Sequence, residues 1–203
     1  MNSSDQELRL WDSFRKGDKE AFAQLFRTHY DSLYQFGSKF TADTQLLEDN
    51  IQELFVQLWQ AKTATPVISI RAYLLKSLKY KLLSAFRQET KIVRLSTFAE
   101  PGFEWSHEAV LIEKQEKDAS KRRVQLAMES LSNRQREIIY LKYFQNLSYE
   151  EVSEIMNINY QAARNLLYQA IKSLRGLLQS PSGLFFVFFA VFCHYIFQSF
   201  TTI

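Results

Sequence analysis

The scarcity of glycine and proline is the feature that most constrains the fold of this chain. Among 203 residues only five are Gly and three are Pro. Sheet proteins need many tight turns, and those turns draw heavily on these two residue types. We therefore expect a helical chain, whose length allows one globular domain or two small ones.

Apolar residues recur at helical spacing in a first stretch of the chain. The pattern predicts a helix over 18–40 with Asp18 as its N-cap, a second helix that begins after residue 43 or 44, and a third over 70–88. A long segment without sustained periodicity follows. Its lack of period is typical of a linker.

A second periodic stretch follows this segment. Ser132 is placed to cap one helix, and Ser148 with Glu151 three residues later fits a capping box at the start of the next. A short turn over 157–159 then leads into a helix over 160–178. Two helices joined by such a turn form a helix-turn-helix unit, a shape that occurs both with and without DNA binding.

These patterns predict an all-α chain in four parts. Residues 8–90 form one helical domain, 91–120 a linker, 121–178 a second helical domain, and 184–203 an apolar C-terminal helix.

The net charge of +3 is an average over segments of opposite sign. Residues 71–94 carry a net +6 and residues 121–175 a net +4, whereas 1–70 carry −3 and 95–120 carry −4. Two basic blocks separated by an acidic segment are typical of a chain that contacts a polyanion twice. Two solvated helix faces would give the same charges, so both interpretations stay open.

The outward side of the predicted helix over 160–178 offers amide, aromatic and basic side chains. Such residue types contact base edges and phosphates. The candidates are Gln161, Arg164, Asn165, Tyr168, Gln169 and Lys172.

Two motifs in this order resemble a known family. The first is LEDNIQELFVQLW over 47–59, and the second combines LSNRQRE over 131–137 with LSYEEV over 147–152. The chain resembles bacterial RNA polymerase sigma factors of the extracytoplasmic-function type. Such a factor binds core RNA polymerase through the β′ and β subunits, directs it to specific promoters and takes part in their melting, often under an anti-sigma protein.

The resemblance implies a polymerase-binding surface in the first domain. In this family the corresponding helix docks on a coiled coil of the β′ subunit. The matching residues are Glu48, Asp49, Gln52, Glu53, Phe55 and Trp59. The other reading of this acidic face is a solvated helix side.

The resemblance also implies two contacts with promoter DNA. The loop over 61–68 would take up a flipped base of the minus-ten element, and the helix over 160–178 would enter the major groove at the minus-thirty-five element. Duplex DNA would be held through phosphates by Arg71, Lys76, Lys79, Lys81 and Arg87, and Tyr80 stands at the family's melting contact.

Several positions depart from the family pattern, among them Gln169, which stands where a basic residue is frequent. Asn50 stands where an apolar residue is usual, and Tyr80 stands where the family has Asn. Ser132 replaces Pro, and Asn157 replaces Gly. Asn tolerates the left-handed backbone that Gly would supply, and a Tyr at position 80 can stack on a base.

Enzyme chemistry is not expected. The three histidines lie far apart without metal-ligand spacing, the glycines form no phosphate-binding loop, and the single Cys193 excludes an intramolecular disulfide. We therefore expect no cofactor and no metal. Two further classes stay open: a helix-turn-helix regulator that acts without polymerase, and a membrane-bound adaptor with a degenerate DNA-binding domain.

The end of the chain carries no charged side chain. Residues 184–203 hold seven of the 17 Phe, and as a helix they would reach about 30 Å, enough for a hydrocarbon core. Lys172 and Arg175 precede this tail, which favours a cytoplasmic protein with possible contact to the inner membrane. Packing against an anti-sigma protein or against the chain itself is the alternative.

Overall fold

The computed structural model describes residues 3–61, 67, 69–92, 102–104 and 126–178. Every regular element within these ranges is a helix, so the predicted all-α class is confirmed. The chain divides into two compact units, Met1–Gly102 and Phe103–Ile203. This division falls inside the segment predicted as a linker.

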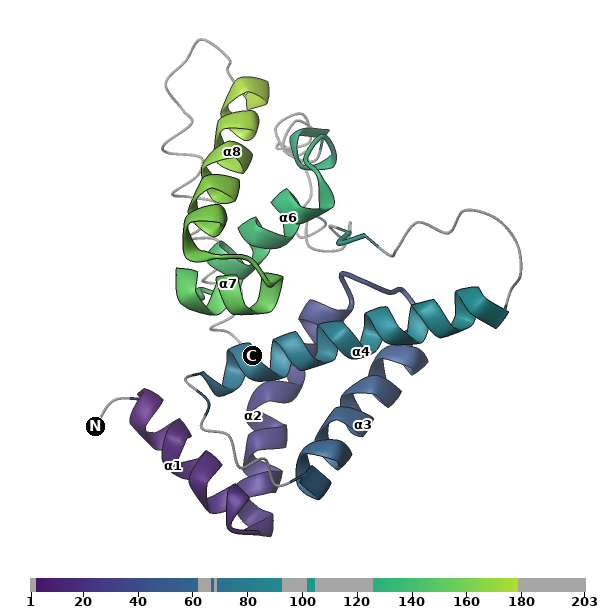
Figure 1. Cartoon of the computed structure of the whole chain (residues 1–203), viewed down its shortest axis with the longest axis vertical. Helices are drawn as coiled ribbons and strands as arrows, with labels where there is room; N and C mark the ends of the chain where they lie inside the picture. Colours follow the sequence, from purple (N-terminus) through teal and green to yellow (C-terminus); the bar gives the residue numbers. More distant parts are fainter. Residues whose placement is uncertain (1–2, 62–66, 68, 93–101, 105–125, 179–203) are drawn as a thin grey trace, which may run out of the picture. The chain divides into compact units, whose positions relative to one another are not determined.

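The described residues of the first unit form four helices (Figure 1). Contacts join α1 to α2 and α4, and they join α2, α3 and α4 to one another. Gly37 at the end of α2 permits a close approach, because a Cβ at that position would collide with the side chain of Leu47. The helices are α1 (Ser3–Arg15), α2 (Lys19–Gly37), α3 (Thr44–Ala61) and α4 (Ile70–Ile92).

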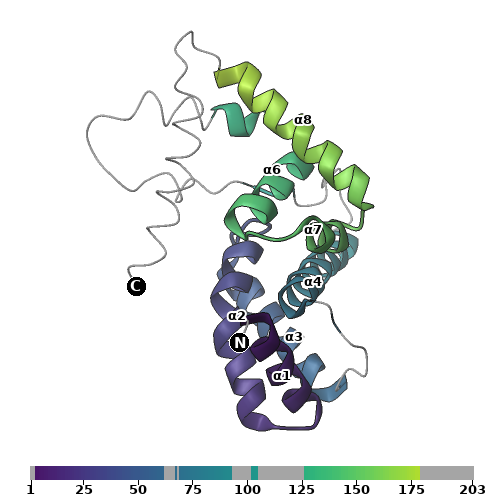
Figure 2. The ribbon, with the colours of Figure 1, turned by 90° about the vertical axis from the view of Figure 1, so that its left-hand side faces the viewer.

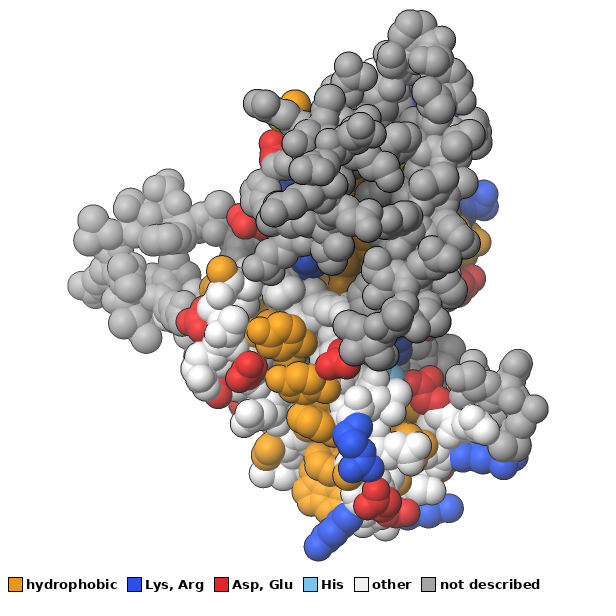
Figure 3. Space-filling view, turned by 180° about the vertical axis from the view of Figure 1, so that it is seen from behind, with side chains coloured by type: hydrophobic (Ala, Val, Ile, Leu, Met, Phe, Trp, Pro, Cys, Tyr) orange, Lys and Arg blue, Asp and Glu red, His pale blue; other side chains and the backbone are white. Residues whose placement is uncertain are grey.

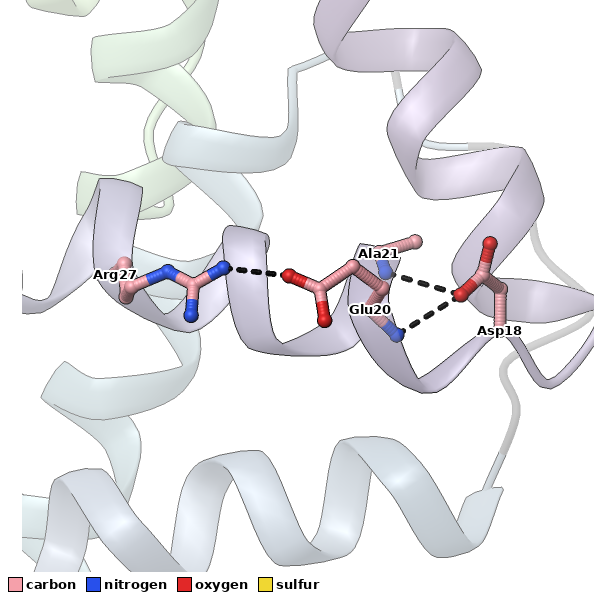
Figure 4. A network of polar contacts seen from close by, with 4 residues as sticks. All are labelled: Asp18, Glu20, Ala21 and Arg27. Carbon is pink, nitrogen blue, oxygen red and sulfur yellow. Dashed lines mark hydrogen bonds and ion pairs between the residues drawn. The ribbon is translucent and has the colours of Figure 1, made fainter.

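The predicted N-cap of α2 is confirmed. Asp18 Oδ1 accepts hydrogen bonds from the backbone N–H groups of Glu20 at 2.9 Å and Ala21 at 3.2 Å. These bonds satisfy donors that a helix start leaves without intrahelical partners (Figure 4). Glu20 also pairs with Arg27 at 2.8 Å. Both partners are exposed, so the pair adds little stability.

An aromatic cluster joins three helices of the first unit. Phe14 of α1 is fully buried, and its ring centroid lies 5.2 Å from that of Trp11, 5.8 Å from Phe22 of α2 and 6.2 Å from Trp59 of α3. Aromatic pairs at such distances add to the free energy gained by burial. The sequence interpretation did not include α1, because its mostly polar residues hide the two buried rings.

The second unit is built around the helix-turn-helix. After a helical turn over 126–129, the elements are α6 (Asn133–Ile139), the π-helical η2 (Tyr140–Phe144), α7 (Tyr149–Met156) and α8 (Tyr160–Leu178). Helix α8 packs against both α6 and α7, and Figure 2 shows α7 beside the first turn of α8.

Local chemistry sets the ends of these helices as the sequence predicts. Ser132 and Ser148 both cap their helices, and each forms a reciprocal capping box with the residue three positions on. Asn157 takes the left-handed backbone at φ 51° and ψ 52°, which ends α7 and turns the chain into α8. Asn therefore fills a position that favours Gly.

An aromatic residue of the predicted linker packs onto the second unit. The side chain of Phe103 is only 2% exposed, and its ring centroid lies 5.4 Å from that of Tyr140. A single aromatic residue inside a segment without periodicity gives no sequence signal, which is why this anchor was not predicted.

Several sequence predictions lie outside the described residues. They are most of the loop over 61–68, most of the linker, and the apolar tail over 184–203. Within the described ranges, none of the helices combines the length and hydropathy that crossing a bilayer demands.

Candidate nucleic-acid and protein interfaces

Helix α8 presents its six predicted DNA-binding residues on one surface. All six are exposed, while Ala163, Leu167 and Ala170 on the other side of the helix are buried. Positions three, four, seven and eight apart share a helix face, which explains the alignment. We call these six residues the α8 stripe: Gln161, Arg164, Asn165, Tyr168, Gln169 and Lys172.

Contacts within the α8 stripe are local. The Gln161 amide donates to Asn165 Oδ1 at 3.1 Å, and the Arg164 guanidinium carbon lies 5.9 Å from the ring centroid of Tyr160. Tyr168 is 68% exposed. Amides and guanidinium groups held on an exposed helix face suit base edges and phosphates.

Helix α4 brings only part of the predicted basic block together. Lys76, Tyr80 and Arg87 share one face, because spacings of four and seven residues return to the same side of a helix. Tyr80 is 49% exposed, Arg87 is exposed and Lys76 is half-buried. We call these three residues the α4 face.

Three of the predicted DNA-binding residues lie off the α4 face. Lys79 and Lys81 flank Tyr80, so each lies about 100° around the helix from it. Lys81 Nζ lies 3.2 Å from Glu53 Oε2 of α3 with a side chain only 16% exposed, and Lys79 Nζ lies 6.0 Å from the Phe40 ring centroid. Long basic side chains cover neighbouring apolar surface in this way.

Arg71, the third residue, lies nine positions before Tyr80 and thus about 180° around α4 from it. Its charge acts on Glu7 of α1, whose Oε1 lies 2.9 Å from Nε2 of the buried His29. The contact with His29, aided by the charge of Arg71, holds the pKa of the Glu7 carboxyl below its usual value, although burial acts the other way. The interactions of Glu7 with His29 and Arg71 therefore link α1 to α2 and α4.

The acidic side of α3 is exposed as predicted. Asp49, Gln52 and Glu53 are exposed, whereas Glu48 is half-buried. Glutamine amides one helical turn away orient two of the carboxylates: Gln45 donates to Asp49 at 2.9 Å, and Gln57 donates to Glu53 at 2.8 Å. We call Glu48, Asp49, Gln52 and Glu53 the α3 acidic face.

Of the two aromatic residues predicted beside this face, Phe55 belongs to the core and Trp59 is partly accessible. Phe55 is 2% exposed, and its ring centroid lies 4.9 Å from Phe26 and 6.0 Å from Phe22 of α2. Phe55 therefore cannot offer its ring to a partner in this fold, which corrects the prediction. Trp59 is half-buried and packs 5.0 Å from Phe22, so only part of its ring is accessible.

An aromatic stripe on α2 borders the α3 acidic face. Phe22, Phe26, Tyr30 and Tyr34 recur every four residues and are all half-buried. Hydrophobic side chains gather in one stripe on the face of the first unit seen in Figure 3. Burial, and then the nearby charge of Glu48, raises the pKa of the Tyr30 hydroxyl. The four-residue spacing is visible in the sequence, but such a pattern more often indicates core packing than a binding surface.

The buried side chain of Asn50 has a hydrogen-bond partner within its own helix. Its side-chain amide donates to the Leu46 carbonyl of its own helix at 2.8 Å. This bond explains how α3 accepts an amide where the family usually has an apolar residue.

Two family comparisons match the chain. The sigma-70 region 2 family matches residues 25–92, and the sigma-70 region 4 family matches residues 121–174, together more than half of the chain. Two curated relatives are each named ECF RNA polymerase sigma factor SigK. The protein from Mycobacterium sp. (strain JLS) is 26% identical over 79% of this chain and 84% of its own length. The protein from Mycobacterium ulcerans (strain Agy99) is 24% identical over 87% and 96%.

The chain belongs to the extracytoplasmic-function sigma factors. It is a transcription initiation factor that directs core RNA polymerase to promoters, in a family of non-enzymatic transcription factors.

Two solved sigma-factor structures share the fold of this sigma factor. One is CnrH in complex with the cytosolic domain of CnrY, with a TM-score of 0.58 and 21% identity over 87% of this chain and 99% of that one. The other is RpoE from Bartonella quintana in complex with the anti-sigma factor NepR. Its TM-score is 0.55, with 21% identity over 79% of this chain and 98% of that one.

Proposed function

We propose that the surfaces described above divide the work of this sigma factor. The α3 acidic face binds core RNA polymerase, and the α4 face and the α8 stripe hold promoter DNA. The observation that carries the proposal is the α8 stripe: all six DNA-type side chains are exposed together on the second helix of a helix-turn-helix.

Exposure and orientation of the carboxylates support the polymerase contact. Asp49 and Glu53 are held by glutamine amides, so less side-chain freedom is lost when a basic partner binds. Acidic groups of this kind steer a basic surface toward them. The aromatic stripe on α2 adds apolar area at the edge of the same surface.

The α4 face supports a contact with the minus-ten region. Lys76 and Arg87 supply positive charge for phosphates, and Tyr80 offers an accessible ring between them for stacking on an unpaired base. Lys79, Lys81 and Arg71 are better assigned to holding the fold, because they lie off the α4 face. Lys81 pairs with Glu53, Lys79 lies near the Phe40 ring, and the charge of Arg71 acts on Glu7.

The α8 stripe supports a contact with the minus-thirty-five element. Recognition helices read base edges with residues near their N-terminal end, and Gln161, Arg164 and Asn165 occupy the first two turns of α8. Lys172 lies farther along, where it would reach a phosphate.

Charge reversal on α3 tests the division of labour. The double variant Asp49→Lys with Gln52→Lys is expected to lose co-elution with core RNA polymerase. The control, Asp31→Lys with Gln24→Lys, makes the same change in charge at exposed positions of α2 and should keep co-elution. Equal binding by both variants would contradict the assigned face. A wild-type chain that binds duplex DNA but never polymerase would instead support a regulator acting alone.

We further propose that an anti-sigma protein is a partner of this chain. CnrH is described in complex with CnrY, and RpoE in complex with an anti-sigma factor, and both share the present fold. The aromatic stripe on α2 is the apolar surface that such a partner would cover. Alanine substitutions at Tyr30 and Tyr34 should weaken the binding of a co-purifying anti-sigma protein. Capture of the same amount of that protein would contradict this assignment.

The uncharged run over 184–203 supports a membrane contact as a separate proposal. Twenty residues without a charge suffice for a bilayer core. Full chain expressed in its source cells should appear in the membrane fraction, and a chain ending at residue 183 should not. Recovery of the full chain wholly in the soluble lysate would overturn this proposal.

A further inference from the structure

Four side chains from three elements of the second unit form a continuous array. Lys142 Nζ of η2 lies 4.7 Å from the ring centroid of Tyr149, the first residue of α7. The Tyr149 ring meets the Tyr160 ring of α8 at 5.7 Å with an interplanar angle of 63°. The Arg164 guanidinium carbon lies 5.9 Å from the centroid of Tyr160. A cation thus stands at each end of an aromatic pair.

The inner half of this array is fixed by the backbone around it. Lys142 Nζ donates to the Leu147 carbonyl at 2.6 Å, which holds the ammonium group beside the Tyr149 ring. Tyr149 directly follows Ser148, whose capping box holds the first turn of α7 through bonds of 3.2 Å and 2.7 Å with Glu151. Tyr149 is therefore a rigid support for the ring that packs on it.

The outer half of the array is exposed and lies where DNA is expected. Tyr160 is 43% exposed, and Arg164 is exposed one helical turn farther along α8. Helical side chains lean toward the helix N-terminus, so the guanidinium of residue 164 is directed over the ring of residue 160. The face of an aromatic ring attracts a cation placed over it.

We propose that Tyr160, supported by Tyr149 and Lys142, is a positioning residue for Arg164 in promoter recognition. The ring holds the guanidinium over the first turns of α8, so Arg164 loses less conformational freedom when it meets the DNA. The inference rests on the proposed role of the α8 stripe in DNA binding. It assigns no direct DNA contact to Tyr160.

A double-mutant cycle on the full chain assembled with core polymerase tests this role. The probe is a promoter fragment that wild-type holoenzyme selects from fragmented source DNA and transcribes. Tyr160→Ala should weaken its binding about two- to fivefold, the range that an exposed cation–π contact gives. Tyr160→Phe should bind like wild type because it keeps the ring. In an Arg164→Ala background, Tyr160→Ala should cause no further loss.

Each other outcome has a defined meaning. If Tyr160→Ala weakens binding equally with and without Arg164, the ring contacts DNA itself and the positioning role is overturned. If Tyr160→Ala binds like wild type, the array has no part in recognition and the inference also fails. Failure of wild-type holoenzyme to select any fragment would instead refute the proposed function. Thermal unfolding of each variant checks that the second unit remains folded.

Discussion

Helices α8 and α4 both carry side chains suited to DNA, but the fold uses those side chains differently. On α8 the six candidates are exposed, and the contacts described for them stay within α8. On α4 the candidates that lie off the α4 face interact with other parts of the first unit, as Lys81 does with Glu53. DNA binding and fold stability are therefore separable on the α8 stripe and coupled on α4.

The largest expected effect concerns Arg164. Because Arg164 is exposed and its contact among the described residues is with Tyr160 of the same helix, Arg164→Ala should cost about 1–3 kcal/mol of DNA-binding free energy. The unfolding temperature of this variant and its binding to core polymerase should match those of the wild type. Fluorescence anisotropy with a selected promoter fragment, alongside thermal melts, measures both. A parallel loss of DNA binding and core binding would break the proposed separation.

Substitutions in the turn that precedes α8 should have the opposite effect, because they should change the stability of the fold. Asn157 has a left-handed backbone, which costs most L-residues about 1–2 kcal/mol but costs Asn and Gly less. Asn157→Ala should therefore lower the unfolding free energy by about 1 kcal/mol, and Asn157→Gly should retain or raise it. Urea unfolding followed by circular dichroism checks this pair, and equal stability of the two variants would refute the argument.

Lys81 provides the matched test on α4. Lys81→Met removes the pair with Glu53 and should lower the unfolding free energy by about 0.2–1 kcal/mol, since the pair is partly exposed. It should leave the salt dependence of promoter binding unchanged. Arg87→Met should instead reduce by about one the slope of the logarithm of the binding constant against the logarithm of the salt concentration. A lower slope for Lys81→Met would show that Lys81 contacts phosphate after all.

The smallest effect concerns the contact between α1 and α2. The folded pKa of Glu7 lies below its ordinary value of 4.5, so its contribution to stability is fully present above that pH. The contribution is lost as pH falls through the lowered folded pKa. Melting temperatures of wild type and Glu7→Gln should thus differ at neutral pH and converge in acid. A difference that grows in acid would have the wrong sign.

Features set by neighbouring residues could be predicted from the sequence. Asp18, Ser132 and Ser148 cap helices through groups two or three residues away, and Asn157 ends α7 through its own backbone preference. The exposed set on α8 followed in the same way, because helix periodicity alone separates Ala163 and its neighbours from that set.

Features set by contacts between distant residues could not be predicted. Lys81 looked like a phosphate ligand because its partner Glu53 lies on another helix, 28 positions earlier. Phe55 was placed at an interface by the family resemblance alone, although helix periodicity puts it on the apolar side of α3 that packs against α2. Phe103 docks on Tyr140 from an aperiodic segment, where a single ring carries no pattern.

Transcription with purified core RNA polymerase tests the central claim most directly. Adding the full chain to core polymerase from the same organism should give a stable complex at low salt and discrete transcripts from a selected promoter fragment. The Asp49→Lys with Gln52→Lys variant should give neither. Failure of the wild-type chain to bind core polymerase at low salt would contradict the account, as would transcripts made equally well by the reversed variant.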